Sequence, residues 1–231
     1  MVDFVLVAGA WLGSWAWEEV VPELRAAGHG AHPLTLTGLA EKRGMPARQR
    51  THVQDIVGEV DRLGLRDPVL VGHSYAAGPV AQAAARTGER PARAVFIDGP
   101  VPADGASCLA AWPDEGRAVA AAIAENGGFW PPPGRAGYDG QGLTEAQIAR
   151  IMRDSTPHPG ASLTDPAVLT RPLAEIPATY VLCLLNRAEP SAAVAELVAG
   201  GHWRQVAMES GHWPMFSRPR ELARILLDAV R

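Results

Sequence analysis

The sequence predicts an α/β protein with a mostly parallel, six-stranded sheet flanked by helices. Six short apolar runs have the length and composition of buried strands, and helical periods separate most of them: residues 3–8, 31–36, 69–71, 94–98, 178–185 and 204–208. Strands that alternate with single helices favour parallel pairing with helices on both faces. With 231 residues, of which 47% are hydrophobic, the chain is long enough for one such domain and short for two.

Caps and periodic apolar positions define the helices between these strands. Residues 14–27 are expected to form an amphipathic helix that ends at Gly28. Thr51, with Gln54 three residues later, has the pattern of a capping box and starts the next helix. Its apolar residues share one face: Val53, Ile56, Val57, Val60 and Leu63. A terminal helix over 219–230 has its own buried side: Leu222, Ile225, Leu226 and Ala229.

Composition excludes several classes of partner. A net charge of −4 without any basic run argues against nucleic acid binding. The apolar stretch FVLVAGAW is too short to span a membrane, and no basic signal-peptide region precedes it, so a cytoplasmic location is expected. Cys108 and Cys183 are far apart and suggest neither a disulfide framework nor a zinc site. No metal or nucleotide motif occurs, so we expect no cofactor and no metal.

One long segment interrupts the alternation of strands and helices. Residues 101–175 show no strand pattern, many Pro and Gly residues, and an aromatic group formed by Phe129, Trp130, Trp112 and Tyr138. Helical patches at 114–125 and 144–154 favour an ordered insertion. An insertion of this length between two strands is usually a lid or substrate-binding cap. We therefore expect a single domain over 1–231, with 1–100 and 176–231 as its core and 101–175 as its lid.

The stretch VLVGHSYAAG at 69–78 places a serine on a sharp turn between a strand and a helix. It differs from the G-x-S-x-G pattern of a nucleophile elbow only at Ala76, which stands where the second glycine usually is. In such a turn the hydroxyl of Ser74 would be exposed at the carboxyl edge of the sheet, where sites form in α/β proteins. The alternative is an ordinary strand–loop–helix turn with an incidental serine.

Several motifs in order along the chain resemble the α/β-hydrolase superfamily: VLVAGAWLGSWAW at 5–17, VGHSYAAG at 71–78, TLTGLAEKR at 35–43, FIDGPVPADG at 96–105 and SGHWPMFSRP at 210–219. The resemblance is to the small group that contains plant methylesterases, salicylate-binding esterases, hydroxynitrile lyases and their bacterial relatives. It implies the α/β-hydrolase fold with a helical lid insertion, and a serine, acid and histidine as the catalytic residues.

Ser74 needs a base, because a serine hydroxyl is a poor nucleophile until its proton is removed. The family position for this base follows the last strand, and His212 stands there. His202 precedes that strand and is expected to be a surface or turn residue. His73, beside the serine, is expected to shape the pocket.

The oxyanion of a tetrahedral intermediate needs backbone amide donors. The resemblance assigns them to Tyr75, after the serine, and to Ala10, in the loop after the first strand. That loop usually carries His-Gly, and here it carries Ala8 and Gly9, so a side chain that typically braces it is missing. Trp11 fits either a pocket wall or plain core. The expected substrate pocket consists of Gly9, Trp11, His73, Trp130 and Trp213.

The acid of the triad has three candidates, because Asn186 stands at the position where the family resemblance implies the acid. An asparagine can orient a histidine but cannot stabilise the imidazolium by charge, and the equivalent change in a serine protease costs about 10⁴ in turnover. Asp98, at the end of its strand, is our first choice, Asn186 as an orienting partner the second and Glu189 the third. A turn or helix cap is the alternative role for Asp98.

The sequence therefore predicts a serine hydrolase that cleaves a small ester, thioester or lactone with an apolar or aromatic part through an acyl-serine intermediate. The alternatives are a lyase, cyclase or decarboxylase on the same fold, or a non-catalytic binding protein. Hydroxynitrile lyases of the group carry a lysine and a threonine where this chain has Trp213 and Gly9, which argues against that activity. The expected partner is a small ester-like molecule, with a homodimer as one option for the oligomeric state.

Overall fold

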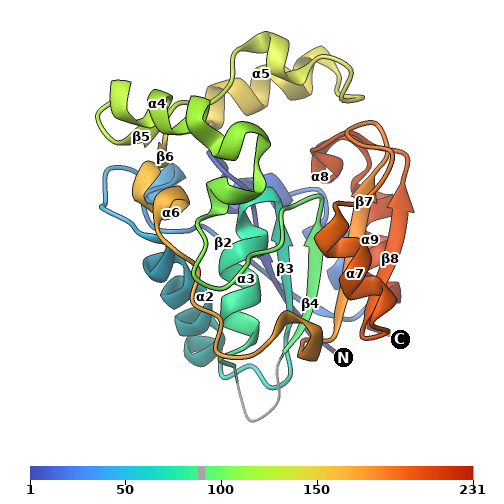
Figure 1. Ribbon diagram of the computed structural model, residues 1–231. Coiled ribbons are helices and arrows are strands. Elements are labelled where there is room, and N and C mark those ends of the chain that lie inside the picture. Colours follow the sequence, from blue (N-terminus) through green and yellow to red (C-terminus); the bar gives the residue numbers. More distant parts are fainter. Residues whose placement is uncertain (88–91, 231) are drawn as a thin grey trace.

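A computed structural model describes residues 1–87 and 92–230, and its centre is a six-stranded sheet (Figure 1). The strand order is β2-β1-β3-β4-β7-β8, and every neighbouring pair is parallel. The strands are β1 (Asp3–Val7), β2 (Gly30–Leu34), β3 (Val69–His73), β4 (Arg93–Ile97), β7 (Ala178–Cys183) and β8 (Trp203–Met208). The predicted parallel sheet with six strands is thus confirmed, each strand within a few residues of its expected bounds.

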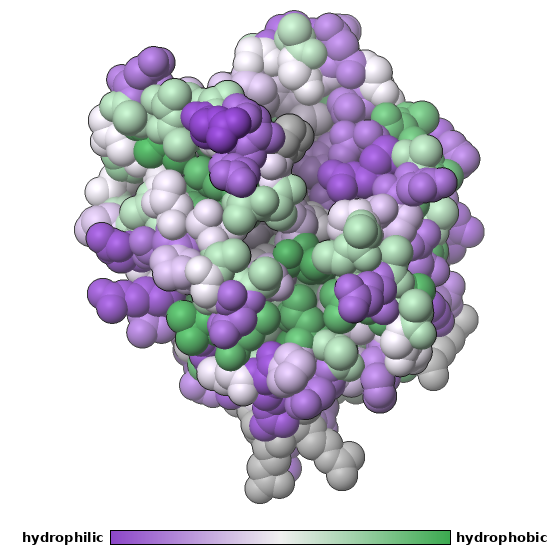
Figure 2. Space-filling model, in the orientation of Figure 1, coloured by the Kyte–Doolittle hydropathy of each residue, from purple (hydrophilic) through white to green (hydrophobic). Residues whose placement is uncertain are grey.

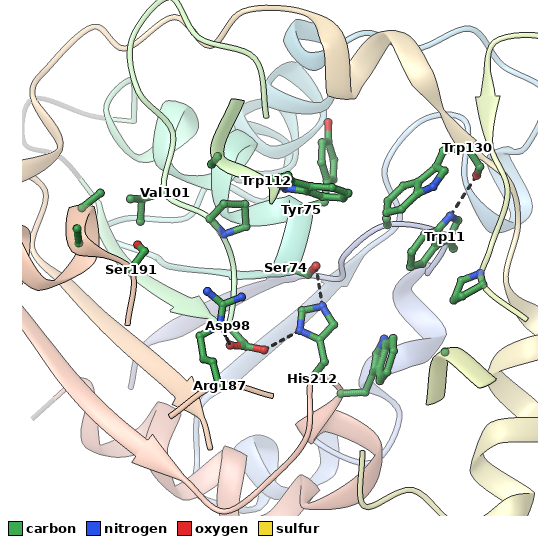
Figure 3. Close-up of a pocket in the computed structure, with 18 residues that line it drawn as sticks. Trp11, Ser74, Tyr75, Asp98, Val101, Trp112, Trp130, Arg187, Ser191 and His212 are labelled. Atoms are coloured by element: carbon green, nitrogen blue, oxygen red, sulfur yellow. Dashed lines mark hydrogen bonds and ion pairs between the residues drawn. The ribbon is translucent and has the colours of Figure 1, made fainter. Parts of the chain in front are cut away.

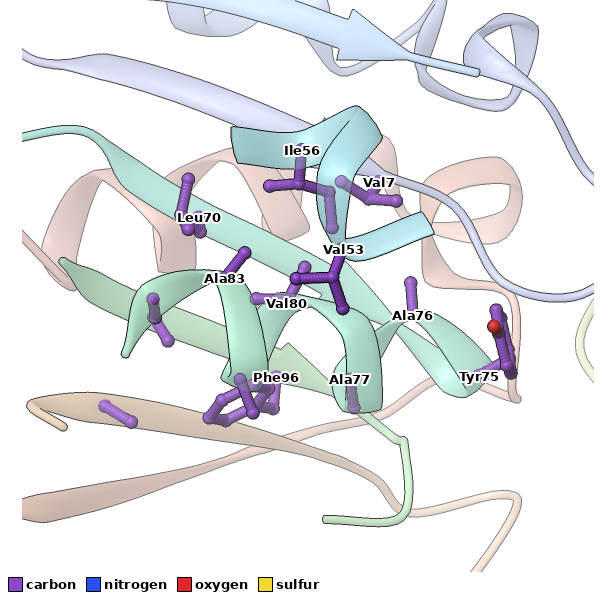
Figure 4. Close-up of a cluster of buried hydrophobic side chains, with 14 of the residues drawn as sticks. Val7, Val53, Ile56, Leu70, Tyr75, Ala76, Ala77, Val80, Ala83 and Phe96 are labelled. Atoms are coloured by element: carbon purple, nitrogen blue, oxygen red, sulfur yellow. The ribbon is translucent and has the colours of Figure 1, made fainter. Parts of the chain in front are cut away.

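Helices cover both faces of this sheet, so its strands are buried on both sides and nearly continuously apolar. The main helices are α1 (Val21–Ala26), α2 (Gln49–Leu63), α3 (Ala77–Ala84), α7 (Ala192–Ala199), α8 (Pro214–Ser217) and α9 (Pro219–Asp228). Along β3, Leu70 packs toward the α2–α3 side, whereas Val69 and Val71 pack toward the α1–α9 side. Figure 4 shows Val53 and Ile56 of α2 in the same cluster as Val80 of α3 and Leu70 of the sheet.

Two helix starts differ from the sequence prediction. The expected helix over 14–27 is a 3₁₀ turn (Ser14–Trp17) followed by α1, because Pro22 lies in the first turn of α1, where a proline starts a helix and cannot continue one. The helix expected to start at Thr51 starts at Gln49, with Arg48 as its N-cap. Thr51 is therefore the third helical residue, and its hydroxyl accepts a hydrogen bond from the Arg48 amide at 3.1 Å.

The 101–175 segment lies over the carboxyl ends of the strands (Figure 1). It contains α4 (Arg117–Glu125), α5 (Glu145–Asp154), α6 (Gly160–Thr164) and an antiparallel pair, β5 (Phe129–Trp130) with β6 (His158–Pro159). The expectation that this segment contains no strand was wrong, because it contains this antiparallel pair. The first helix starts later than expected, because Asp114 and Glu115 have positive φ angles. The segment's role as a lid stays a prediction.

Short 3₁₀ turns connect the remaining parts of the chain: Ala40–Lys42, Ser74–Ala76, Cys108–Ala111, Pro113–Gly116, Arg135–Tyr138 and Leu173–Glu175. Within the described residues, none of the helices has the length and apolarity needed to cross a membrane.

We expect two substitutions in α2 to change stability in opposite directions. Ile56 is fully buried, so Ile56→Ala should lower the free energy of unfolding by about 3 kcal/mol through lost burial and a cavity. Gly58 is exposed on the same helix, and an added Cβ would meet nothing within 4 Å, so Gly58→Ala should raise the free energy of unfolding by about 1 kcal/mol. Urea unfolding followed by circular dichroism measures both. A Gly58→Ala variant less stable than wild type would contradict this description of α2.

Candidate active site

Ser74 occupies a strained turn between β3 and α3. Its φ angle is 53°, a left-handed conformation that non-glycine residues seldom adopt and that costs on the order of 1–3 kcal/mol. The surrounding backbone is close: a Cβ on Gly9 would lie 2.7 Å from the Ser74 Cβ, and one on Gly72 would lie 2.8 Å from the Ala76 oxygen. Such strain is retained where the surroundings enforce it, as expected of a nucleophile elbow.

Three side chains from separate parts of the chain form one hydrogen-bonded series (Figure 3). His212, in the loop after β8, has its Nε2 2.9 Å from the Ser74 Oγ and its Nδ1 2.7 Å from an Asp98 carboxylate oxygen. Since a carboxylate can only accept, Nδ1–H donates to Asp98 and Nε2 is left to accept from the serine hydroxyl. This tautomer is the one that a general base for Ser74 requires.

Asp98 follows β4 and is almost completely buried, with 1% of its surface exposed. The Oδ2 that accepts from His212 also accepts from the Asn186 Nδ2 at 2.6 Å. The Arg187 Nε lies 3.3 Å from the other oxygen, Oδ1. No donor in the described residues is aligned for a hydrogen bond with Oδ1, so this last contact is electrostatic.

The structure therefore separates the three acid candidates. Asp98 contacts His212 directly. Asn186 does not serve as the orienting partner of His212: its amide donates to Asp98 instead, which corrects our second choice. Glu189, in the same loop as Asn186, is exposed to solvent. A carboxylate at the end of β4 thus faces the imidazole of His212.

Ala10 and Tyr75 both line the cavity beside Ser74, as oxyanion donors must. Behind them, the Gly9 amide donates to the His73 Nδ1 at 3.2 Å, so the His73 Nε2 carries the proton and donates to the His212 carbonyl at 2.7 Å. Burial, followed by the nearby charge of His212, lowers the pKa of His73 well below its usual value, which keeps the ring neutral as this bonding requires.

Two residues expected in the pocket wall, Gly9 and His73, do not line it. His73 is 1% exposed and lies beneath the loop, because its ring bonds the backbone on both sides. Its ring supports the loop of Gly9 and Ala10 from below, in place of the bracing histidine that this chain lacks at position 8. Sequence reasoning missed this role because the bracing residue is not in the loop itself.

The cavity above Ser74 has a volume of about 880 Å³ and a strongly aromatic side. That side is formed by Trp11, Trp112, Trp130 and Trp213. The Trp11 Nε1 donates to the Trp130 carbonyl at 3.1 Å, and the centroids of the two rings are 4.1 Å apart. Trp11 is thus wall and not plain core, and its φ of 67° turns it toward the 101–175 segment. Figure 2 shows the surface hollowed between that segment and the part holding α8.

The 101–175 segment also holds the loop of His212. The Gln141 side-chain oxygen accepts from the His212 backbone amide at 2.6 Å, and the Tyr138 ring lies 4.9 Å from that of Trp213. Gln141, Trp112 and Arg187 are site residues that our sequence reasoning did not assign. Trp112 had a signal in the aromatic content of the insertion, and Arg187 in its place beside Asn186, whereas Gln141 had none.

A buried polar network supports the elbow from the side of α2. The His52 Nδ1 lies 2.8 Å from the Tyr75 hydroxyl, and its Nε2 lies 2.8 Å from the Thr37 carbonyl. His158, from β6, stacks edge-on against Tyr75 and has its Nε2 2.8 Å from the Ser162 Oγ. Burial lowers the pKa of both histidines.

The described residues contain no group of three or more His, Cys, Asp or Glu side chains placed to hold a metal ion.

Comparison with known proteins places the chain in a family. A model of the alpha/beta hydrolase family matches residues 4–225, so the chain belongs to that family, and the resemblance read from the motifs is confirmed. Its structure is similar to that of an extracellular α/β-hydrolase from a Paenibacillus species described as a homologue of tobacco salicylic acid binding protein 2. That similarity has a TM-score of 0.87 at 21% identity over 99% of both chains, and it shows the fold.

Two sequence relatives are esterases by name. The chain is 34% identical over 116 residues to the carbendazim hydrolyzing esterase of Nocardioides sp., a match of 49% of this chain and 48% of the relative. It is 37% identical over 114 residues to esterase PIR7B of Oryza sativa subsp. japonica, a match of 44% of this chain and 40% of the relative. The matches thus span less than half the length of either relative.

The three buried histidines predict a loss of stability in acid. The folded-state pKa values of His52, His73 and His158 are all lowered, so below about pH 6.5 the unfolded chain binds protons that the folded chain rejects. The free energy of unfolding should therefore fall with falling pH, by up to about 1.4 kcal/mol per pH unit for each histidine. Urea unfolding at about pH 7.5, 6 and 5 measures this slope.

A matched pair of variants assigns the slope to buried histidines. His158→Gln should make it shallower, while His202→Gln, at an exposed position, should leave it unchanged. An unchanged slope in His158→Gln would contradict a neutral, proton-rejecting His158 in the folded state.

Proposed function

We propose that this protein is a serine hydrolase that cleaves small carboxylic esters, thioesters or lactones with an apolar or aromatic part through an acyl-serine intermediate. The observation that carries the proposal is the hydrogen-bonded series from Ser74 through His212 to the buried Asp98. The esterase names of two relatives support ester cleavage as the reaction. The aromatic side of the cavity supports an apolar or aromatic substrate.

In this mechanism the His212 Nε2 removes the proton of Ser74 as its Oγ attacks the carbonyl carbon of the substrate. The carbonyl oxygen becomes an oxyanion that accepts hydrogen bonds from the Ala10 and Tyr75 amides, and loss of one such donor costs on the order of 10²–10³ in rate. The tetrahedral intermediate collapses, and His212 gives its proton to the leaving alcohol or thiol. Water, deprotonated by His212, then attacks the acyl-serine, and His212 returns that proton to the Ser74 Oγ as the acid is released.

Asp98 supplies the charge that this cycle needs. His212 becomes an imidazolium each time it takes a proton, and a buried carboxylate 2.7 Å away stabilises that cation with little screening by water. Asn186 and Arg187 hold the carboxylate in place from the loop after β7. Among the described residues, no specific contact favours lyase-type chemistry or non-catalytic binding over hydrolysis. A homodimer and a cytoplasmic location stay predictions.

A covalent inhibitor tests whether Ser74 is activated. A small fluorophosphonate reacts with serines that have a working base, so wild type should gain the mass of a single adduct and Ser74→Ala should gain none. Intact-mass spectrometry after incubation measures both proteins side by side. A folded wild-type protein that stays unmodified would contradict the proposed function.

The two residues bonded to the same oxygen, Asp98 and Asn186, should differ sharply in importance. Asp98→Asn removes the charge behind His212 and should lower kcat for an aryl acetate by about 10⁴-fold. Asn186→Ala removes one hydrogen bond to the carboxylate, worth about 1.5 kcal/mol, and should lower kcat by about tenfold. Steady-state kinetics, with circular dichroism to confirm folding, compares the two. Equal or reversed effects would overturn Asp98 as the acid.

A further inference from the structure

We propose that Arg187 binds a carboxylate of the substrate on the side of Ser74 opposite the tryptophans, so that the preferred esters combine one aromatic part with one acidic part. This inference rests on the proposed function and names its substrate class. It starts from the uneven distribution of side chains around the cavity, which is aromatic on one side and carries a cation on the other.

Arg187 has donors that the protein does not use. Its Nε faces the Asp98 Oδ1 at 3.3 Å, and this is the one polar contact of the side chain within the described residues. The side chain is 39% exposed and lines the cavity. A guanidinium has five N–H donors in a planar fork, so the two terminal nitrogens remain available for the paired oxygens of a carboxylate. In Figure 3 the guanidinium of Arg187 points into the cavity.

The start of α7 adds positive potential on the same side. Ser191, Ala192 and Ala193 line the cavity next to Arg187. Ser191 is the N-cap, with its hydroxyl accepting from the Val194 amide, so the helix begins at the cavity wall. Unpaired amides in a first helical turn favour an anion. This positive potential adds to the charge of the Arg187 guanidinium, which is the group that would bind the carboxylate.

The charge of Asp98 does not cancel this attraction. Its carboxylate is 1% exposed and lies behind the cavity wall, and Oδ2 is already bonded to His212 and Asn186. Of the charged groups that line the cavity, Arg187 is the one with a largely accessible face. A substrate that enters the cavity therefore meets a cation on this side, and an acidic group is the complement that a guanidinium recognises best.

The opposite side of Ser74 selects the other part of the substrate. Trp11 and Trp130 lie across the serine from Arg187 and Ser191 in Figure 3. Because the reacting carbonyl must sit at the Ser74 Oγ, the acyl and alcohol parts extend in different directions from it. One part then reaches the tryptophans and the other reaches the guanidinium. A simple aromatic ester would leave the two terminal nitrogens of the Arg187 guanidinium without an acceptor.

Two pairs of matched esters test the proposal without assuming which part is acidic. In the first pair, benzyl hydrogen succinate has the carboxylate on the acyl side, and benzyl levulinate replaces it with a methyl ketone. In the second pair, carboxymethyl phenylacetate has the carboxylate on the alcohol side, and acetonyl phenylacetate is its neutral counterpart. Chromatography of the released products gives kcat/KM for each.

For wild type, we expect the acid in at least one pair to have a kcat/KM about tenfold above that of its ketone, the gain typical of a charge-assisted bidentate contact. Arg187→Gln should reduce that ratio to about one, and Arg187→Lys should retain part of it, because a lysine keeps the charge but not the fork. Arg62→Gln, on the exposed side of α2 and paired with Glu59, is the matched control and should keep the full ratio.

The ratio separates substrate binding from support of Asp98. Arg187→Gln removes a contact to Asp98 as well, but that loss slows both members of a pair alike and cancels in their ratio. Three results would overturn the inference: wild-type ratios near one in both pairs, a raised ratio that is unchanged in Arg187→Gln, or no cleavage of any of the four esters by a protein that takes up the fluorophosphonate. Failure to take up the fluorophosphonate would instead overturn the proposed function.

Discussion

The contact between His212 and the buried Asp98 carboxylate is the interaction on which the arrangement of the site depends. A carboxylate with 1% exposure is strongly disfavoured unless its oxygens have donors, and here one oxygen has two donors and the other faces a guanidinium. Those donors come from the loops after β7 and β8, so the burial of one charge ties three neighbouring strand ends together. The same contact fixes the tautomer of His212, and through it the base for Ser74.

The parallel sheet makes this contact achievable because it brings the ends of β3, β4, β7 and β8 to one edge. The ends of β3 and β4 then bend away through backbone that most residues avoid: Ser74 and Asp98 both have positive φ angles. The 101–175 segment closes over this edge and bonds the His212 amide through Gln141. Strand order sets which side chains meet, and strained turns after the strands set their directions.

The features that could be predicted from the sequence are those encoded by contiguous residues. Six strands follow from apolar runs, and Ser74 and His212 follow from short motifs beside those runs, because each motif and its strand are contiguous. Asn186 as a donor to Asp98, His73 as a brace and Gln141 as a support for His212 were out of reach, since each depends on a partner 64 or more positions away in the chain. The predicted starts of two helices were also wrong, for local reasons: Pro22 lies in the first turn of α1, and Arg48 is the N-cap of α2.

Placing the acid on β4 has a consequence for the cavity. The family resemblance implies an acid in the loop after β7, at the position of Asn186. Here that loop supplies the donors Asn186 and Arg187, and a guanidinium satisfies a carboxylate with one edge only. The opposite edge of the Arg187 guanidinium, beside the start of α7, faces the cavity. With the carboxylate at the end of β4, the loop after β7 contributes a guanidinium to the cavity wall, so the position of Asp98 and the charge of that wall are linked.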